Sequence, residues 1–172
     1  MTNKATIALF AKYNEMANIG MCKVISSLTN DEWNKRFEDC FFKSVRQLAV
    51  HIFTSDFGGL GRCGNLRPFK TLEDPYFQTT YDPRAEIFTD KDEYLAKRPE
   101  LDKKILSLVD EFTDADMAGI LKFTTPRGDM ERNFGAMQLQ YFTHSMHHRG
   151  MISVYLELMG KENDYNGLGQ AL

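Results

Sequence analysis

Residues 135–159 decide the fold and read GAMQLQYFTHSMHHRGMISVYLELM. Large side chains recur in this stretch at steps of three and four residues, the period of one helix face in a bundle. The predicted stripe comprises Met137, Tyr141, His144, His148, Met151 or Ile152, Tyr155 and Met159. Gly160 follows at once, and a glycine in this place commonly ends a helix. The sequence therefore predicts a bundle helix that carries His144 and His148 on its core-facing side.

The spacing of His144 and His148 suits a shared metal ion. Residues four apart on a helix lie about 40° apart around the axis and ~6 Å apart along it. Two buried imidazoles need partners when neutral, and a zinc, nickel, iron or copper ion supplies one partner for both. A hydrogen-bonded pair in the core, or a solvated pair, is the alternative. His147 could replace His148 as ligand, but it points further from the stripe, and we expect it to face solvent or an interface.

A third ligand is expected from His51, which lies outside the histidine cluster. The segment Ser44–Gln47 has the form of a capping box, so a helix should begin there. We expect this helix to end near the pair Gly58-Gly59, because glycines are poor helix formers. If it neighbours the last helix, three imidazoles meet and leave one coordination position for water. That arrangement is typical of a reactive metal site.

Two further helices are expected over Thr6–Leu28 and Asp90–Phe112, where apolar residues recur at the same steps. Pro99 predicts a kink in the second of them, or a fresh start at Glu100. The stretch Asp31–Phe42 is expected to be a connection with a short helical turn around Trp33.

A long connection and a hairpin complete the predicted architecture. Gly61–Thr89 lacks helical periodicity, and its aromatic residues predict that it packs on the bundle; they are Phe69, Tyr76, Phe77 and Tyr81. The stretches 119–124 and 130–134 flank turn-forming residues and predict a two-stranded hairpin. We therefore predict an all-α protein, with one domain over residues 1–172. It would be a four-helix bundle with a long connection between the second and third helices and a small hairpin before the last. A looser all-α domain without the hairpin is the alternative.

The composition limits which partners and which cellular compartment are expected for the protein. A hydrophobic fraction of 42% and a charged fraction of 26% are ordinary for a folded domain. The net charge of -3 argues against nucleic acid as the main partner. No apolar run has the length of a signal peptide core or a membrane span. Cys22, Cys40 and Cys63 form no Cys-x-x-Cys pair, so we expect reduced thiols and a cytoplasmic protein without a membrane partner.

Two charged residues near the histidines are candidates for catalysis. Arg149 could hold a substrate carboxylate with two hydrogen bonds, or it could form a structural ion pair with an acid such as Glu15. Asp56 could orient a ligand or activate water, or it could be a solvated acid near a helix end. Tyr141 and Tyr155 are expected to pack in the core, although a phenol beside a metal could also donate a proton.

Three segments resemble one known family. The stretch from His144 to Ile152, HSMHHRGMI, is similar to the H-x-x-x-H-R-G-Q-I helix of the DinB-like (DinB/YfiT-type) proteins. Ser44–His51 resembles the second-helix segment of that family, and Phe10–Asn18 resembles its first helix. The resemblance implies a four-helix bundle with a divalent metal on His51, His144 and His148, often as a homodimer. The chain departs from the pattern at Met151, where the family frequently has Gln, and at the additional His147.

The resemblance also implies a range of activities. Some relatives transfer thiol cofactors such as bacillithiol, mycothiol or glutathione, others isomerise or hydrolyse small substrates, and many have no known activity. We therefore expect a divalent metal (Zn, Ni or Fe) that activates a low-molecular-weight thiol, or water, toward a small electrophile. A metal-dependent hydrolase and a non-catalytic, metal-stabilised stress or scaffold protein are the alternatives.

Overall fold

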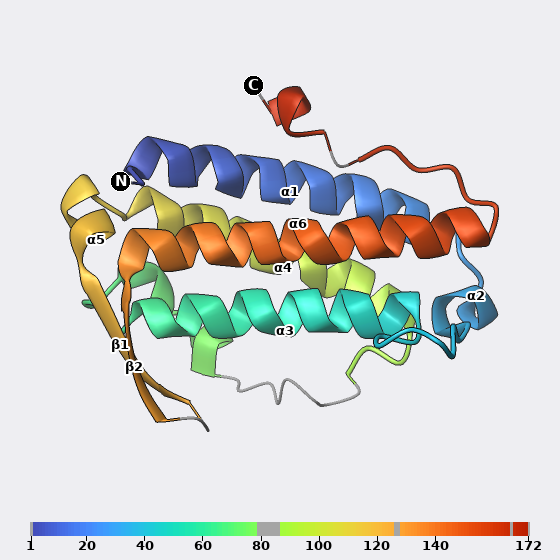
Figure 1. The fold of residues 1–172 in the computed structure, drawn as a ribbon, viewed down its shortest axis with the longest axis horizontal. Helices are drawn as coiled ribbons and strands as arrows, with labels where there is room; N and C mark the ends of the chain where they lie inside the picture. Colours follow the sequence, from blue (N-terminus) through green and yellow to red (C-terminus); the bar gives the residue numbers. More distant parts are fainter. Residues whose placement is uncertain (1, 79–86, 126–127, 166, 172) are drawn as a thin grey trace.

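A computed structural model describes residues 2–78, 87–125, 128–165 and 167–171. In this part of the chain four long helices lie alongside one another (Figure 1): α1 (Lys4–Ser26), α3 (Val45–Cys63), α4 (Lys91–Asp110) and α6 (Phe134–Leu158). Helix α1 packs against α4 and α6, and α3 packs against the same two helices from the other side. The predicted four-helix bundle is confirmed. None of its helices combines the length and the apolar composition that a membrane span requires, as far as the described residues go.

Side-chain caps begin all four long helices, because their first N–H groups have no partner within the helix. The capping residues are Asn3, Ser44, Asp90 and Asn133. Ser44 accepts the N–H of Gln47 as predicted, but the side-chain oxygen of Gln47 accepts the N–H of Lys43 and not that of Ser44, so the predicted capping box is only half formed. At the other end of α6, Gly160 has a φ of +73° and the N–H of Lys161 bonds back to the carbonyl of Leu156. The predicted glycine stop is therefore present.

Helix α3 corrects one sequence expectation. It continues through Gly58-Gly59 to Cys63, so the connection that follows begins later than predicted. That connection contains two 3-10 helices, η1 (Lys70–Glu73) and η2 (Pro75–Gln78). Phe69 is buried against the rings of Phe112 and Phe134, so this part packs on the bundle as expected. The expectation for Tyr81 lies outside the described residues.

Helix α4 runs without interruption through Pro99, so no fresh start occurs at Glu100. The short helix α2 (Asn30–Asn34) is the predicted turn around Trp33, whose side chain is fully buried.

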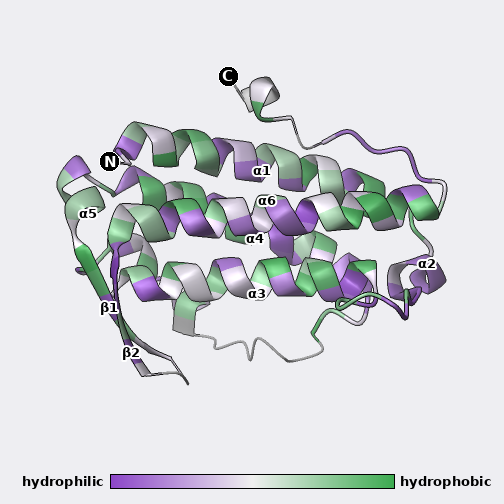
Figure 2. Ribbon diagram, viewed as in Figure 1, coloured by the Kyte–Doolittle hydropathy of each residue, from purple (hydrophilic) through white to green (hydrophobic). Residues whose placement is uncertain are grey.

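The predicted hairpin is present beyond the short helix α5 (Asp114–Ala118). Strands β1 (Ile120–Thr125) and β2 (Gly128–Asn133) pair antiparallel, with Ile120 opposite Asn133. Figure 2 shows a hydrophobic start of β1 beside a hydrophilic end of β2. The turn residues 126–127 lie outside the described residues. After α6 the described residues of the tail are irregular except for the 3-10 helix η3 (Leu168–Ala171).

The buried face of α6 lies to one side of the predicted stripe. Its fully or nearly buried residues include Gln138, Phe142, Ser145, Arg149, Ile152 and Leu156. Tyr141 and His144 are only half-buried. The reason is that α6 packs against α1 as well as α3, so its buried face is centred between the two neighbours. His144 and His148 consequently lie toward the α3 edge of that face.

Candidate metal centre

Three imidazoles from two neighbouring helices converge on one point. Helix α3 supplies His51, and α6 supplies His144 and His148. The Nε2 atom of His144 lies 3.1 Å from the Nε2 atoms of both other rings, and the three candidate ligand atoms all lie within 4.8 Å of one another. Tetrahedral coordination with metal–nitrogen bonds of 2.0–2.1 Å places ligand nitrogens about 3.3 Å apart. The spacing of the donor atoms therefore fits one metal ion.

The environment keeps these imidazoles neutral, which is the form that binds a metal. Burial, followed by the neighbouring imidazoles, lowers the pKa of His148 to about 4. Burial is also the main cause of the lowered pKa values of His51 and His144, and the charge of Asp56 partly opposes both shifts. At neutral pH the three rings thus offer nitrogen lone pairs, and the donor set suits zinc, nickel or iron.

His147 stays outside this group, as the sequence analysis expects. Its side chain is exposed, and its ring contacts His148 edge-on, with the ring centres 4.9 Å apart. Only His51, His144 and His148 meet the distance requirement for a shared ion among the described residues.

Phe42 forms one wall of the histidine cluster, a role that no pattern in the sequence predicted. Its ring centre lies 4.6 Å from that of His51 and 5.3 Å from that of His148. Tyr155 donates its hydroxyl to the Phe42 carbonyl, and Phe37 stacks on the Tyr155 ring at 4.3 Å. Tyr155 therefore anchors this wall. No periodic signal marks Phe42, because it lies in a connection between helices.

Asp56 is not a solvated acid at a helix end. The continuation of α3 to Cys63 places it inside the helix, where only 7% of the residue is exposed. One carboxylate oxygen accepts the Ser145 hydroxyl at 2.7 Å, and the other accepts Nη1 of Arg98 at 2.8 Å. With both oxygens engaged in the core, Asp56 is poorly suited to act as a general base.

Arg149 also differs from both sequence interpretations. It is fully buried, so a substrate carboxylate cannot reach it without opening the core. Its Nη1 donates to the side-chain oxygens of Asn14 at 2.6 Å and Asn18 at 3.1 Å, and Glu15 is not its partner. Arg149 therefore joins α6 to α1.

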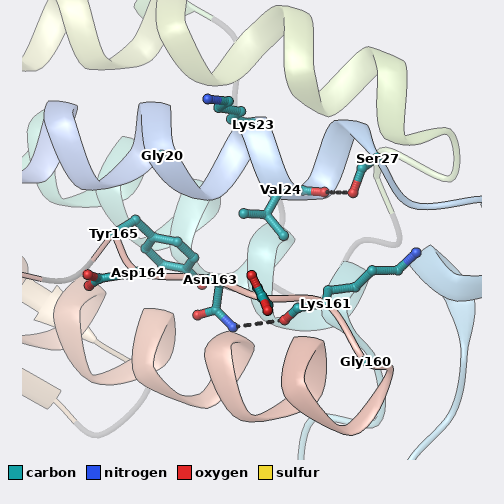
Figure 3. Close-up of a pocket in the computed structure, with 10 residues that line it drawn as sticks. Gly20, Lys23, Val24, Ser27, Gly160, Lys161, Asn163, Asp164 and Tyr165 are labelled. Atoms are coloured by element: carbon teal, nitrogen blue, oxygen red, sulfur yellow. Dashed lines mark hydrogen bonds between the residues drawn. The ribbon is translucent and has the colours of Figure 1, made fainter.

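A separate surface cavity of about 850 Å³ lies between α1 and the segment that follows α6 (Figure 3). Its lining carries both signs of charge, including Lys23, Lys161 and Asp164, and no histidine. The cavity offers no convergent set of ligand atoms, so the histidine cluster remains the candidate functional site.

Comparisons with known proteins identify the family and the fold of the chain. The family model described as "DinB family" matches residues 1–165. Among solved structures, YfiT from Bacillus subtilis superimposes with a TM-score of 0.68 at 19% sequence identity. The match covers 94% of this chain and 92% of that one. YfiT is described as a probable metal-dependent hydrolase with an unusual four-helix bundle topology. At this identity the likeness shows the shared fold. No curated protein sequence matches the chain.

Proposed function

The chain belongs to the DinB family, and we propose that it is a metal-dependent hydrolase of small molecules, with a divalent ion on His51, His144 and His148. The observation that carries this proposal is the convergence of three neutral imidazoles, with Nε2 contacts of 3.1 Å. When bound by three neutral ligands, a divalent ion keeps an open position and lowers the pKa of a water or thiol held there. The description of YfiT as a probable hydrolase supports water as that nucleophile.

The protein's own residues would shape the approach of the substrate. Phe42 gives the cluster an apolar wall, which excludes water from one side of the imidazoles and favours a substrate with an apolar group. The bond from Tyr155 to the Phe42 carbonyl would hold that wall in place. His51 and His148 would be kept neutral by burial and would present their lone pairs without first losing a proton.

Transfer of a low-molecular-weight thiol is the second candidate activity, because the same site would also favour a thiolate. The contact expected between Arg149 and the carboxylate of a thiol cofactor is not available, because Arg149 is fully buried. A non-catalytic, metal-stabilised stress or scaffold protein is the third candidate.

An activity assay separates the three candidates. Untagged protein loaded with zinc, nickel or iron would be offered a panel of esters, amides and small electrophiles. Each substrate would be tested with and without glutathione, bacillithiol or mycothiol. We expect turnover without thiol, abolished in His144→Ala and retained in His147→Ala. Turnover that requires a thiol would identify the protein as a thiol transferase. Wild-type rates no higher than those of His144→Ala would favour the non-catalytic scaffold protein.

We also propose that two copies pair through the outer face of α6. The exposed residues of this helix are Ala136, Gln140, Met146, His147, Gly150, Val154, Glu157 and Leu158. Glu157 is the one carboxylate among them, and Val154 and Leu158 are 52% and 64% exposed. A long helix face with so little charge favours contact with a second copy.

Light scattering tests this pairing. We expect twice the 19.8 kDa mass of the chain for the wild type and for Ile120→Glu, which changes an exposed apolar residue on the hairpin. Leu158→Glu should give the monomer mass. A wild-type monomer at high concentration would refute the pairing. We also propose that the protein is cytoplasmic, as expected from the sequence. Its three cysteines are free thiols, which supports a reducing compartment.

A further inference from the structure

A continuous chain of buried polar side chains crosses the bundle beside the histidine cluster. We call it the polar layer; in order of contact it consists of Ser145, Asp56, Arg98, Asp102, Asn18, Arg149 and Asn14. None of these residues is more than 7% exposed, and all four long helices contribute to the layer.

Arg98 of α4 lies at the centre of the layer. Its Nη1 donates to Asp56 of α3 at 2.8 Å. Its Nη2 and Nε donate to the two carboxylate oxygens of Asp102 at 2.6 and 3.1 Å. Three donors of one guanidinium are thereby engaged, which fixes the plane of the group and the position of both carboxylates.

Asn18 extends the layer to α1 and α6. Its side-chain nitrogen donates to Asp102 at 2.8 Å, and its side-chain oxygen accepts Nη1 of Arg149 at 3.1 Å. The amide of Asn18 therefore lies between a carboxylate and a guanidinium. Its NH2 group faces the carboxylate and its oxygen faces the guanidinium. The two guanidinium groups of the layer balance its two carboxylates, so the layer as a whole carries no net formal charge.

The layer is connected to the helices that carry the candidate ligands. Ser145 directly follows His144 in α6, and Arg149 directly follows His148. Asp56 lies on α3, the helix of His51. The 2.7 Å hydrogen bond from Ser145 to Asp56 thus joins the two ligand-bearing helices, while Arg98 holds Asp56 from the opposite side.

Stability alone is a weak reason for such a layer. Replacing a buried ion pair with apolar residues of similar size is often neutral or stabilising. An apolar contact, however, permits small rotations and shifts of one helix against another, whereas a short hydrogen bond between buried groups permits one arrangement. Removing a group that orients a metal ligand typically changes metal affinity by about 10- to 100-fold.

We propose that Asp56 is a positioning residue of the metal centre, which acts through its hydrogen bond to Ser145 to set α3 against α6 so that the three Nε2 atoms converge. This inference rests on the proposed metal site. It assigns Asp56 no proton transfer, because both of its oxygens are engaged in the layer.

The test compares metal affinity with stability. Zinc affinity would be measured by chelator competition, and the visible spectrum of the cobalt-loaded protein would report the ligand geometry. We expect Ser145→Ala and Asp56→Ala to weaken zinc binding by about ten-fold or more and to alter the cobalt spectrum. Asp56→Asn should retain affinity within about three-fold, because its amide can donate to Ser145 and accept from Arg98.

Two matched controls separate positioning from general destabilisation. Asp116→Asn removes another buried acid that is paired with an arginine, Arg67, and that lies in the short helix α5 before the hairpin. Ser153→Ala repeats the serine substitution on α6, two turns beyond Ser145. Both controls should retain the affinity and the cobalt spectrum of the wild type, even where urea unfolding shows that they are less stable.

Each result has one meaning. Wild-type affinity in Ser145→Ala and Asp56→Ala, with loss of zinc in His144→Ala, would overturn the positioning role and leave the metal site standing. Equal losses of zinc affinity in Asp56→Asn and Asp56→Ala would overturn the positioning role, and would show that the negative charge of Asp56 is what matters. No zinc on the wild-type protein would overturn the metal site and the inference together.

Discussion

Gly59 of α3 lies so close to the ring of Tyr141 on α6 that a Cβ at Gly59 would meet three ring atoms at 3.1 Å. A glycine pair usually weakens a helix, yet α3 continues through this one. The close approach explains why, because the missing side chain at Gly59 lets α3 and α6 pack together along the helices that carry the histidines. Contact with a neighbouring helix thus outweighs the local preference.

Alanine substitutions at the two adjacent glycines should have opposite effects. A Cβ at Gly58 meets no atom within 4 Å, so Gly58→Ala should stabilise the protein by about 0.5–1 kcal/mol through the lower entropy of the unfolded chain. Gly59→Ala gains the same entropy term but must displace the Tyr141 ring, and we expect a net loss. Urea unfolding of both variants measures the difference. Equal stabilisation would contradict the role of Gly59 in packing.

Local signals in the sequence were sufficient for most of the fold. Ser44 and Gly160 mark helix ends through their own hydrogen bonds and backbone angles, which depend on a few neighbouring residues. The histidine spacing on α6 and the isolated His51 likewise indicated which residues converge, because helix periodicity converts spacing into direction.

The features that the sequence did not reveal depend on contacts between separate elements of the structure. Periodicity could not show that α6 buries Ser145 and Arg149 against two neighbours, since that depends on where α1 lies. The partners of Arg149 could not be predicted, because Asn14 and Asn18 are more than 130 positions away. Phe42 contacts His51 from an irregular connection, where no pattern predicts direction.

Metal content should depend on three of the four histidines. His51→Ala and His144→Ala each remove one of the converging Nε2 atoms, so each should lose most of the bound zinc. His147→Ala should bind as much zinc as the wild type, because its exposed ring lies outside the cluster. Mass spectrometry of untagged protein after exposure to zinc measures the content. Equal content in all variants would contradict the proposed ligand set.

The metal-free protein should lose stability as the pH falls from about 6.5 toward 4. The pKa of His148 is about 4 in the folded protein, while an unfolded histidine has a pKa of ~6.5. Between these values the unfolded chain binds a proton that the folded chain does not, so acid favours unfolding. The lowered pKa values of His51 and His144 act in the same direction.

The variant His148→Gln isolates this effect, because all other groups titrate in both proteins. Urea midpoints with a chelator present, measured from pH 7.5 to 5, should fall less steeply for His148→Gln than for the wild type. Parallel curves would show that His148 titrates equally in the folded and unfolded chains. Zinc added at neutral pH should raise the wild-type midpoint, and acid should remove that gain because protons compete for the ligand nitrogens.

The segment after α6 should detach when Gly20 is replaced. Tyr165 lies against Gly20 of α1 (Figure 3), and a Cβ at Gly20 would meet the Cβ of Tyr165 at 2.6 Å. Tyr165 is 4% exposed, and its hydroxyl accepts the Ser153 hydroxyl at 3.1 Å. Gly20→Ala should expel this ring and cost about 1.5–3 kcal/mol, the usual value of burying a large side chain.

Limited proteolysis measures the detachment directly. Lys161 forms an ion pair with Glu32 at 2.9 Å, which ties the start of this segment to α2. In Gly20→Ala we expect trypsin to cut after Lys161 faster than in the wild type, at a rate followed by mass spectrometry. Gly150→Ala is the matched control, because a Cβ there meets nothing within 4 Å. Equal cutting rates in the two variants would show that the tail does not depend on the contact between Gly20 and Tyr165.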